Sequence, residues 1–336
     1  MAVDLATGLA AYLGLHWGTD VEVSGLSTTT AGARRHNVIF DATREGITER
    51  FVATIVPEGE TLINSIEAEA GVRDVAERHG VAVPHVELVR ADGELVGGPF
   101  MISAFTAGET VPRRVLRLVE QVGNGELIAH QLGESLARLH QIDPAAVPVP
   151  LRRQEHPGHP TEAALAAAIA AVDDLALARP ALRLGLRWLE RHLPPAPERL
   201  TIVHSDTRNG NLIIGEDGLR AVLDWEGTWA SGDPMQDLAW PALRMWRFRN
   251  DDREIGGFAG RAPYVEGYTS AGGHFDEARF EWWKVLGTLM WGVGLAGQTM
   301  SFLDGRVPNI VMAASGRRVP ELEWDLLMLI RPSTEG

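Results

Sequence analysis

Three polar residues between positions 201 and 238 have the types and the spacing that phosphoryl transfer requires. Asp206 follows a short β-branched run, Asn211 comes five residues later, and Asp224 follows another apolar run. A carboxylate can orient an attacking hydroxyl group and accept its proton, and magnesium prefers oxygen ligands such as carboxylates and amides. We therefore predict that Asp206 is the catalytic base and that Asn211 and Asp224 are magnesium ligands.

The residues around these three predict a β-hairpin that brings them together. Apolar runs at 201–203, 212–214 and 221–223 have the composition of short strands, and Gly215 and Gly218, with acidic residues between them, mark a tight turn. The loop between the first two polar residues is short, and the third follows a single turn. We therefore expect all three side chains at one edge of the hairpin.

The motifs in this stretch resemble those of a family of small-molecule kinases. The protein-kinase template is H-R-D, four residues and N, followed by D-F-G. This chain keeps the Asp-to-Asn spacing without the Arg or the Phe-Gly, and its motifs are His204-Ser205-Asp206 with Asn211, Leu223-Asp224-Trp225-Glu226, and Gly232-Asp233-Pro234-Met235-Gln236-Asp237-Leu238-Ala239. The set resembles the aminoglycoside phosphotransferase and choline-kinase-like family, with H-G-D-x-x-x-x-N, D-W/F-E and G-D-P-x-x-D-L-A. It departs at Ser205, where glycine is usual.

This resemblance implies an α+β, two-lobed, protein-kinase-like fold. Residues 1–107 would form a small, β-rich N-terminal lobe that binds the nucleotide, and residues 108–336 would form a larger, helical C-terminal lobe for catalysis and substrate binding. The stretch 94–109 resembles the strand and hinge that join the lobes in this family. Apolar residues at helical spacing in 125–143 predict a core helix of the second lobe.

The resemblance also places nucleotide phosphates against the first lobe. Gly32 lies in a turn that is similar to the family's glycine-containing loop, although an ordinary turn is an equal alternative. Thr54 falls on the strand where the family has a basic residue, and Lys284, the only lysine, lies in the C-terminal part. Arg34 and Arg35, beside the glycine, are the candidates to replace that basic residue; the alternative is that both are exposed turn arginines.

Two further nucleotide contacts follow from the resemblance. Glu69 occupies the place of the helix glutamate that pairs with the strand's basic residue in this family, and the alternative is a surface glutamate. Backbone groups around Ser103 to Phe105 would contact the adenine, because hinge recognition uses main-chain donors and acceptors.

Other polar residues of the motifs divide into catalytic and structural candidates. We predict that Arg208 is catalytic, either neutralising charge in the transition state or anchoring an acidic group of the acceptor. The pattern H-G-D-x-R-x-x-N occurs in a subgroup that resembles the kinase-like domains fused to acyl-CoA dehydrogenases. We interpret His140, His204, Asp233 and Asp237 as structural.

Composition limits the class of protein and its partners. The net charge of -14 argues against a nucleic-acid partner, because phosphate backbones require clustered Lys and Arg. The absence of cysteine excludes disulfides and Cys-based zinc sites and fits the cytoplasm. The stretch 285–303 lacks charged residues, but its glycines and hydroxyl-bearing residues favour a buried helix over a membrane span. The N-terminal 14 residues lack the features of a secretory signal.

The predicted function is that of a kinase which transfers the γ-phosphoryl group of ATP or GTP, with Mg²⁺, to a hydroxyl group of an unidentified small molecule. Two alternatives remain at the level of sequence. A nucleotide-binding pseudokinase would explain the missing strand lysine. A metal-dependent hydrolase would use His204, Asp206 and Asp224 as ligands.

Overall fold

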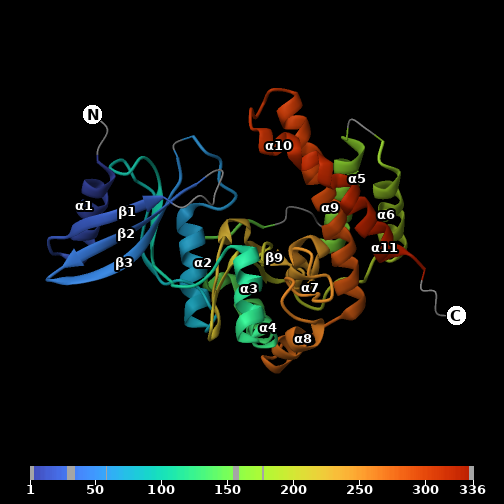
Figure 1. Ribbon diagram of the computed structural model, residues 1–336, viewed down its shortest axis with the longest axis horizontal. Coiled ribbons are helices and arrows are strands. Elements are labelled where there is room, and N and C mark those ends of the chain that lie inside the picture. The colour runs from blue at the N-terminus through green and yellow to red at the C-terminus, as the bar shows by residue number, and fades with distance from the viewer. Residues whose placement is uncertain (1–3, 29–34, 58, 154–158, 176–177, 333–336) are drawn as a thin grey trace.

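The computed structural model describes residues 4–28, 35–57, 59–153, 159–175 and 178–332. The N-terminal part holds a five-stranded antiparallel sheet in the order β1-β2-β3-β5-β4. Its strands are β1 (Glu22–Thr28), β2 (His36–Arg44), β3 (Ile47–Ile55), β4 (Val86–Arg90) and β5 (Phe100–Ala104). The sheet and the C-terminal helices lie at opposite ends of the molecule in Figure 1.

One face of this sheet is covered by helix α1 (Leu5–Trp17). The strand residues alternate, so that Phe40 of β2 and Phe51 of β3 point to the same side, where they pack with Leu9 and Leu13 of α1. This period of two is what places one row of side chains in the core of a half-buried sheet.

Helix α2 (Ile66–Arg78) packs near β4 and β5, and Ile66 and Ala70 are buried with Met101. Ser65 caps the helix, because its hydroxyl accepts a hydrogen bond from the N–H of Ala68 at 3.2 Å. This cap fixes where the helix begins and therefore which of its residues point toward the catalytic hairpin.

The C-terminal part is mainly helical and surrounds a large apolar core. Its helices are α3 (Pro112–Val122), α4 (Gly125–Gln141), α5 (Pro160–Asp173), α6 (Pro180–Arg191), α7 (Pro234–Ala239), α8 (Arg261–Ser270), α9 (Glu277–Leu303), α10 (Ile310–Ser315) and α11 (Val319–Ile330). Short 3₁₀ helices connect them, namely η1 (Pro144–Ala146), η2 (Trp225–Gly227), η3 (Trp240–Ala242), η4 (Arg244–Arg247) and η5 (Gly316–Arg318). Helix α4 supplies many of the buried residues, which confirms the core helix predicted for 125–143.

The predicted hairpin is confirmed as β7 (Leu212–Gly215) and β8 (Gly218–Val222), which pair in antiparallel register. The first apolar run, β6 (Thr201–Val203), does not join it but pairs with β9 (Trp229–Gly232). The hairpin is also bonded to the chain that leaves the N-terminal sheet, because Glu109 and Ile214 form a β-bridge.

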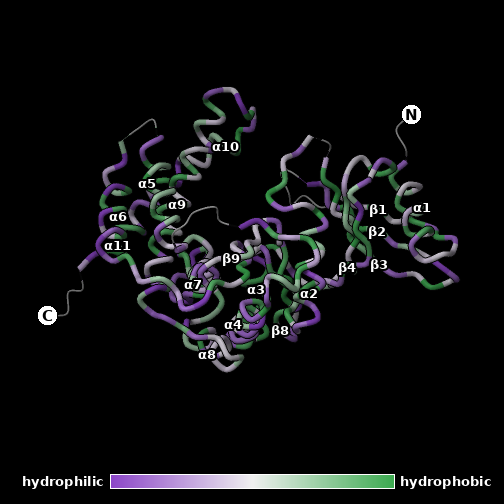
Figure 2. Tube along the Cα trace, turned by 180° about the vertical axis from the view of Figure 1, so that it is seen from behind, coloured by the Kyte–Doolittle hydropathy of each residue, from purple (hydrophilic) through white to green (hydrophobic). Residues whose placement is uncertain are grey.

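The apolar stretch 285–303 lies within α9, which is buried over its first half. In Figure 2 the tube around α9 is a mixture of pale and green segments rather than uniformly green. No helix in the described part of the chain is long and apolar enough to cross a membrane.

Helices α4 and α8 approach each other closely through glycines. A methyl group added at Gly133 of α4 would lie 2.2 Å from the carbonyl oxygen of Tyr264, and one at Gly267 of α8 would lie 2.0 Å from that of His130. Side chains at these positions would force the helices apart. The contact therefore fixes α8 against α4, and both helices carry residues that support the catalytic loop.

We expect Gly133→Ala to lower the free energy of unfolding by about 1–3 kcal/mol, because the added methyl group overpacks this contact. Chemical denaturation measures the change. Gly294→Ala is the matched control: Gly294 lies exposed in α9 with nothing within 4 Å of an added methyl group, so alanine there should stabilise the helix by about 0.5–1 kcal/mol. Equal stability of the two variants would contradict the close approach.

Candidate active site

Asp206 lies in the loop before β7 and accepts hydrogen bonds from three side chains. Its Oδ2 accepts from Nδ2 of Asn211 at 2.6 Å, and its Oδ1 accepts from Nε1 of Trp240 at 2.7 Å and from Nε of Arg208 at 3.2 Å. The structure thus brings together Asp206, Asn211 and Arg208, which the sequence singled out. These donors fix the orientation of the carboxylate before any ligand binds.

The backbone of this loop is held by the buried carboxylate of Asp237. Its two oxygens accept from the backbone N–H groups of His204 and Ser205, each at 2.6 Å. Nε2 of His140 lies 3.2 Å from the same carboxylate, and Nδ1 of His140 lies 3.0 Å from the hydroxyl of Tyr268. A neutral imidazole with its proton on Nε2 satisfies both contacts. Asp237 and His140 therefore support the loop rather than reach substrate, as the sequence predicted.

Ser205 occupies a backbone conformation that favours glycine. Its φ is +73°, in the left-handed region where a β-carbon costs about 1–2 kcal/mol. Glycine would adopt this conformation without that cost. The two hydrogen bonds to Asp237 hold the loop in shape despite this strain.

Asp224 lies beside Asn211, because the N–H of Leu223 donates to the carbonyl oxygen of Asn211 at 2.8 Å. Although Asp224 is exposed to solvent on one side, desolvation by the surrounding protein raises its pKa to about 6, and the charges of Glu226, Asp206 and Glu69 add to the shift. Such a cluster of carboxylates is stabilised by a bound cation.

Asn211 completes an oxygen-donor set that fits magnesium. Its Nδ2 donates to Asp206, so its Oδ1 is the atom turned to other partners, and no described residue donates to that oxygen. Asp224 supplies a carboxylate from the next strand end. Amide and carboxylate oxygens are the ligands that this hard cation prefers.

Arg35 forms an ion pair with Glu69. On the sequence alone, a basic residue at the position of Thr54 would have been the expected partner of this glutamate. Nη1 of Arg35 lies 2.6 Å from Glu69 Oε2, and its Nε lies 3.0 Å from Glu226 Oε2. Burial opposes the charge of Arg35, but Glu69, then Glu226 and Asp224, raise its pKa above the usual value. Its side chain is 9% exposed, so the alternative of an exposed turn arginine is wrong. Glu69 is 4% exposed, which excludes the surface glutamate.

Contacts between the two parts of the chain hold this ion pair in place. Nδ2 of Asn64, just before α2, donates to the backbone oxygens of Glu226 and Thr228 at 3.1 and 2.8 Å. Oδ1 of Asn64 accepts from the N–H of Arg152 at 2.8 Å. Helix α2, and Glu69 with it, is thereby fixed against the segment that follows Asp224.

The other side chains and loop residues predicted to contact the nucleotide are Gly32, Arg34, Thr54 and Ser103. Gly32 and Arg34 lie outside the described residues. Thr54 is on β3 as predicted, but its hydroxyl donates to Oδ1 of Asn37 at 2.8 Å. Ser103 is 6% exposed, and its hydroxyl accepts from Nη2 of Arg73 at 3.0 Å.

The predicted hinge contacts require one correction. The N–H groups of Ala104 and Phe105 already donate to the carbonyl oxygens of His85 and Arg50, at 2.9 and 3.0 Å. Both groups are therefore occupied by pairing between strands and cannot donate to an adenine without a rearrangement.

The surroundings of His204 do not favour the metal ligand that the hydrolase alternative requires. It is 0% exposed, its Nδ1 accepts from the N–H of Asp206 at 3.2 Å, and burial lowers its pKa. No group of three or more His, Asp or Glu residues in the described part of the chain could hold a metal ion. A site built on Asp224 and Asn211 uses only one such residue together with an amide.

Trp240 is the site residue that the sequence did not reveal. Its indole N–H donates to Asp206, and its ring packs with Trp246 and Trp291 at centroid distances of 5.9 and 6.1 Å. The guanidinium of Arg208 lies 4.9 Å from the centroid of the Trp246 ring. The only signal was the abundance of aromatic residues after position 239, which did not identify the one beside the catalytic base.

Comparison with known proteins identifies the relatives of this arrangement. Residues 27–283 match the phosphotransferase enzyme family. Over 208 residues, 57% of this chain, the sequence is 29% identical to acyl-CoA dehydrogenase family member 11 from Gallus gallus, and the chain spans 25% of that protein's length.

Solved structures of related proteins have the same fold. A candidate aminoglycoside phosphotransferase from Ralstonia eutropha JMP134 superposes with a TM-score of 0.74 at 21% identity, over 96% of this chain and 97% of that one. A spectinomycin phosphotransferase in complex with ADP and spectinomycin gives a TM-score of 0.59 at 13% identity, over 97% of this chain and 95% of that one. The predicted α+β, protein-kinase-like fold is therefore confirmed.

The raised pKa of Asp224 predicts opposite effects on stability and on ligand binding. Its pKa of about 6 in the folded protein lies above the ordinary 3.8, so the ionised carboxylate lowers stability above pH 6. That loss shrinks as the pH falls through 6 toward the ordinary pKa of 3.8, and it vanishes only below that value, where the carboxyl is protonated in both states. We expect Asp224→Asn to raise the Tm of the ligand-free protein at about pH 7.5 and to raise it much less near pH 4.

The same substitution should abolish magnesium-dependent nucleotide binding, and in the unmodified protein that binding should weaken about tenfold per pH unit below 6. Asp217→Asn is the control. Asp217 is also a carboxylate, but its hydrogen bond from Arg220 lowers its pKa instead of raising it. Thermal unfolding across pH measures the effect. An equal Tm shift for Asp224→Asn at both pH values would contradict the assignment.

Proposed function

We propose that this chain, which belongs to the phosphotransferase enzyme family, transfers the terminal phosphoryl group of ATP or GTP to a hydroxyl group of a small molecule. Family membership makes it a phosphotransferase that acts on hydroxyl acceptors, and the details below are what the site adds. The lobe boundary near residue 107 and the cytoplasmic location remain part of this proposal, the latter on the cysteine-free composition.

The observation that carries the proposal is the buried ion pair of Arg35 with Glu69. The chain lacks a lysine on β3, and this absence would otherwise favour a pseudokinase. Arg35 brings a positive charge to Glu69, the glutamate with which a lysine on β3 would be expected to pair. Its Nη2 is buried and has no hydrogen-bond partner in the described residues, and a phosphate oxygen would satisfy that donor.

The catalytic loop supports a step in which Asp206 orients the acceptor hydroxyl. Oδ1 of Asp206 is occupied by two donors, whereas Oδ2 accepts only from Asn211, so Oδ2 keeps a lone pair for the hydroxyl. The three donors hold this carboxylate in one orientation. That suits a loose transition state, in which positioning contributes more than early proton removal.

Magnesium held by Asn211 and Asp224 would neutralise charge on the phosphates during transfer. Arg208, stacked on Trp246 and bonded to Asp206, lies where it can neutralise the transferring group or hold an acidic part of the acceptor. Solved structures of this fold include complexes with ADP and with GDP, so both nucleotides belong in the test. The spectinomycin complex supports a small-molecule acceptor with hydroxyl groups.

The test of the nucleotide site begins with calorimetric titration of ATP and GTP, with and without magnesium. We expect Arg35→Gln to weaken binding of the preferred nucleotide about ten- to hundredfold, because a charge-assisted contact to phosphate is lost. Arg35→Lys should recover part of it. Arg50→Gln is the control, since Arg50 forms an exposed ion pair with Asp41 on the same sheet. Full affinity in Arg35→Gln would refute the replacement of the lysine.

The test of catalysis uses Asp206→Ala in a screen of alcohols and aminoglycosides. This variant should retain nucleotide affinity within about threefold while losing turnover by at least about a thousandfold, because it lacks the carboxylate that orients the acceptor hydroxyl. Phosphoryl transfer from radiolabelled nucleotide provides the measurement. Turnover unchanged by the substitution would remove Asp206 from the mechanism, and nucleotide binding without any transfer would favour the pseudokinase.

A further inference from the structure

We propose that a cavity between α9, α11 and η4, separate from the catalytic loop, binds a small organic anion with an apolar body. Its volume is about 320 Å³, at the lower end of the range of small-molecule sites. Its lining contains four basic side chains, one carboxylate and an apolar wall, as follows: Ala242, Arg244, Arg247, Lys284, Thr288, Trp324, Asp325, Met328, Leu329 and Arg331.

The cavity does not belong to the proposed catalytic site. None of the residues that contact Asp206 lines it. Within η4 the side chains divide: Trp246 packs against Arg208 near the catalytic loop, whereas Arg244 and Arg247 face the cavity. The inference therefore stands independently of the kinase proposal.

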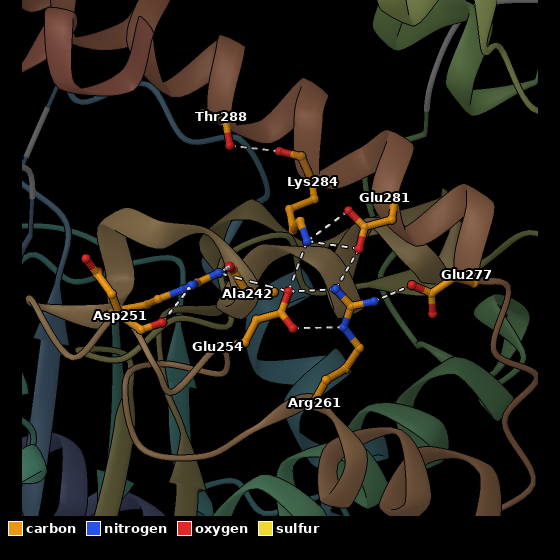
Figure 3. Close-up of polar contacts among 9 residues, drawn as sticks. Ala242, Asp251, Glu254, Arg261, Glu277, Glu281, Lys284 and Thr288 are labelled. Atoms are coloured by element: carbon orange, nitrogen blue, oxygen red, sulfur yellow. Dashed lines mark hydrogen bonds and ion pairs between the residues drawn. The ribbon is translucent and has the colours of Figure 1, made fainter. Parts of the chain in front are cut away.

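Lys284, the chain's only lysine, is fixed at the wall by carboxylates that lie outside the cavity. Its Nζ contacts Glu254 and Glu281, at 2.9 and 2.8 Å, and Arg261 joins the same two glutamates (Figure 3). The side chain of Lys284 is 7% exposed. These glutamates hold the ammonium group in place without lining the cavity themselves.

Arg247 is less compensated than Lys284, the other cation of the lining that is not exposed. Its Nη1 and Nη2 donate to the backbone oxygens of Asp251 and Ala242, and its closest carboxylate oxygen, on Glu254, is 4.0 Å away. Its Nε is buried and has no hydrogen-bond partner among the described residues. Burial lowers the pKa of Arg247, as expected for a guanidinium that lacks a close counter-charge. An anion in the cavity would supply that charge.

The remaining charges of the lining leave the cavity electropositive. Asp325, its one carboxylate, is already paired with Nη1 of Arg244 at 2.6 Å. Arg331, at the end of α11, is exposed and forms no ion pair with a described residue. A ligand carboxylate or phosphate would therefore meet Arg247 and Arg331 without a competing free acid.

The wall formed by α11 indicates that the ligand has an apolar body. Trp324 is 61% exposed and Met328 is 38% exposed, and Leu329 lies beside them. Large apolar side chains that border a charged pocket bury their surface when a ligand's apolar part packs on them. A bare inorganic anion would leave this wall in water.

Calorimetry on the full chain tests the proposal with hexanoate, the matched neutral amide hexanamide, and inorganic phosphate. We expect hexanoate to bind, hexanamide not to bind, and phosphate to bind at least about tenfold more weakly than hexanoate. Arg247→Gln should weaken hexanoate about tenfold or more. Because that substitution also removes two backbone contacts, the exposed variants Arg331→Gln and Trp324→Ala should each weaken it as well.

Arg249→Gln is the charge-matched control, since Arg249 is exposed and outside the cavity, and it should bind hexanoate normally. Saturating magnesium-ATP should leave hexanoate binding unchanged, which separates this site from the catalytic one. The proposal is overturned if hexanoate fails to bind or binds no better than hexanamide or phosphate. Competition with ATP, or full affinity in all three lining variants, would overturn it too.

Discussion

The arrangement of the catalytic loop depends on one buried carboxylate, that of Asp237. A fully buried carboxylate is unfavourable unless hydrogen-bond donors surround it, and here the donors come from elements far apart in the sequence. His140 of α4 and the N–H groups of His204 and Ser205 meet it directly, and Tyr268 of α8 supports His140. The close glycine contact between α4 and α8 therefore supports the loop that carries Asp206, because it sets where His140 and Tyr268 lie.

The part of the site that could be predicted from sequence is the part made by short-range geometry. Asp206 and Asn211 are separated by one tight loop, and β7 and β8 by one two-residue turn, so the types of residue and their spacing determine which side chains meet. The register of this hairpin then delivers Asp224 beside Asn211. The helical spacing of apolar residues likewise predicted α4, because residues on the buried face of a helix recur every three or four positions in the sequence.

What could not be predicted rests on contacts between distant segments. The resemblance singled out Arg35 and Glu69 separately, but their ion pair depends on tertiary contacts, such as those by which Asn64 holds α2 against the backbone after Asp224. Trp240 was one of many tryptophans, and only the tertiary fold selects its N–H as a partner for Asp206. The pairing of β6 with β9 rather than with the hairpin depended on the same kind of long-range arrangement.

The charge distribution at the site makes the binding of metal and nucleotide mutually dependent within the proposed function. Asp206, Asp224, Glu226 and Glu69 place four carboxylates near two guanidinium groups, those of Arg35 and Arg208. Arg35 is paired with Glu69 and Glu226, and Arg208 with Asp206, so both compensate Asp224 only in part. A nucleoside triphosphate without magnesium would add negative charge to the excess of carboxylates. Magnesium bound with it would compensate the negative charge of both the phosphates and the carboxylates. The pKa of Asp224 is raised by burial and by these neighbouring carboxylates, as expected where a bound cation would be favourable. Under the proposed function, an arginine held by two glutamates would replace the lysine, and the nucleotide would bind together with magnesium.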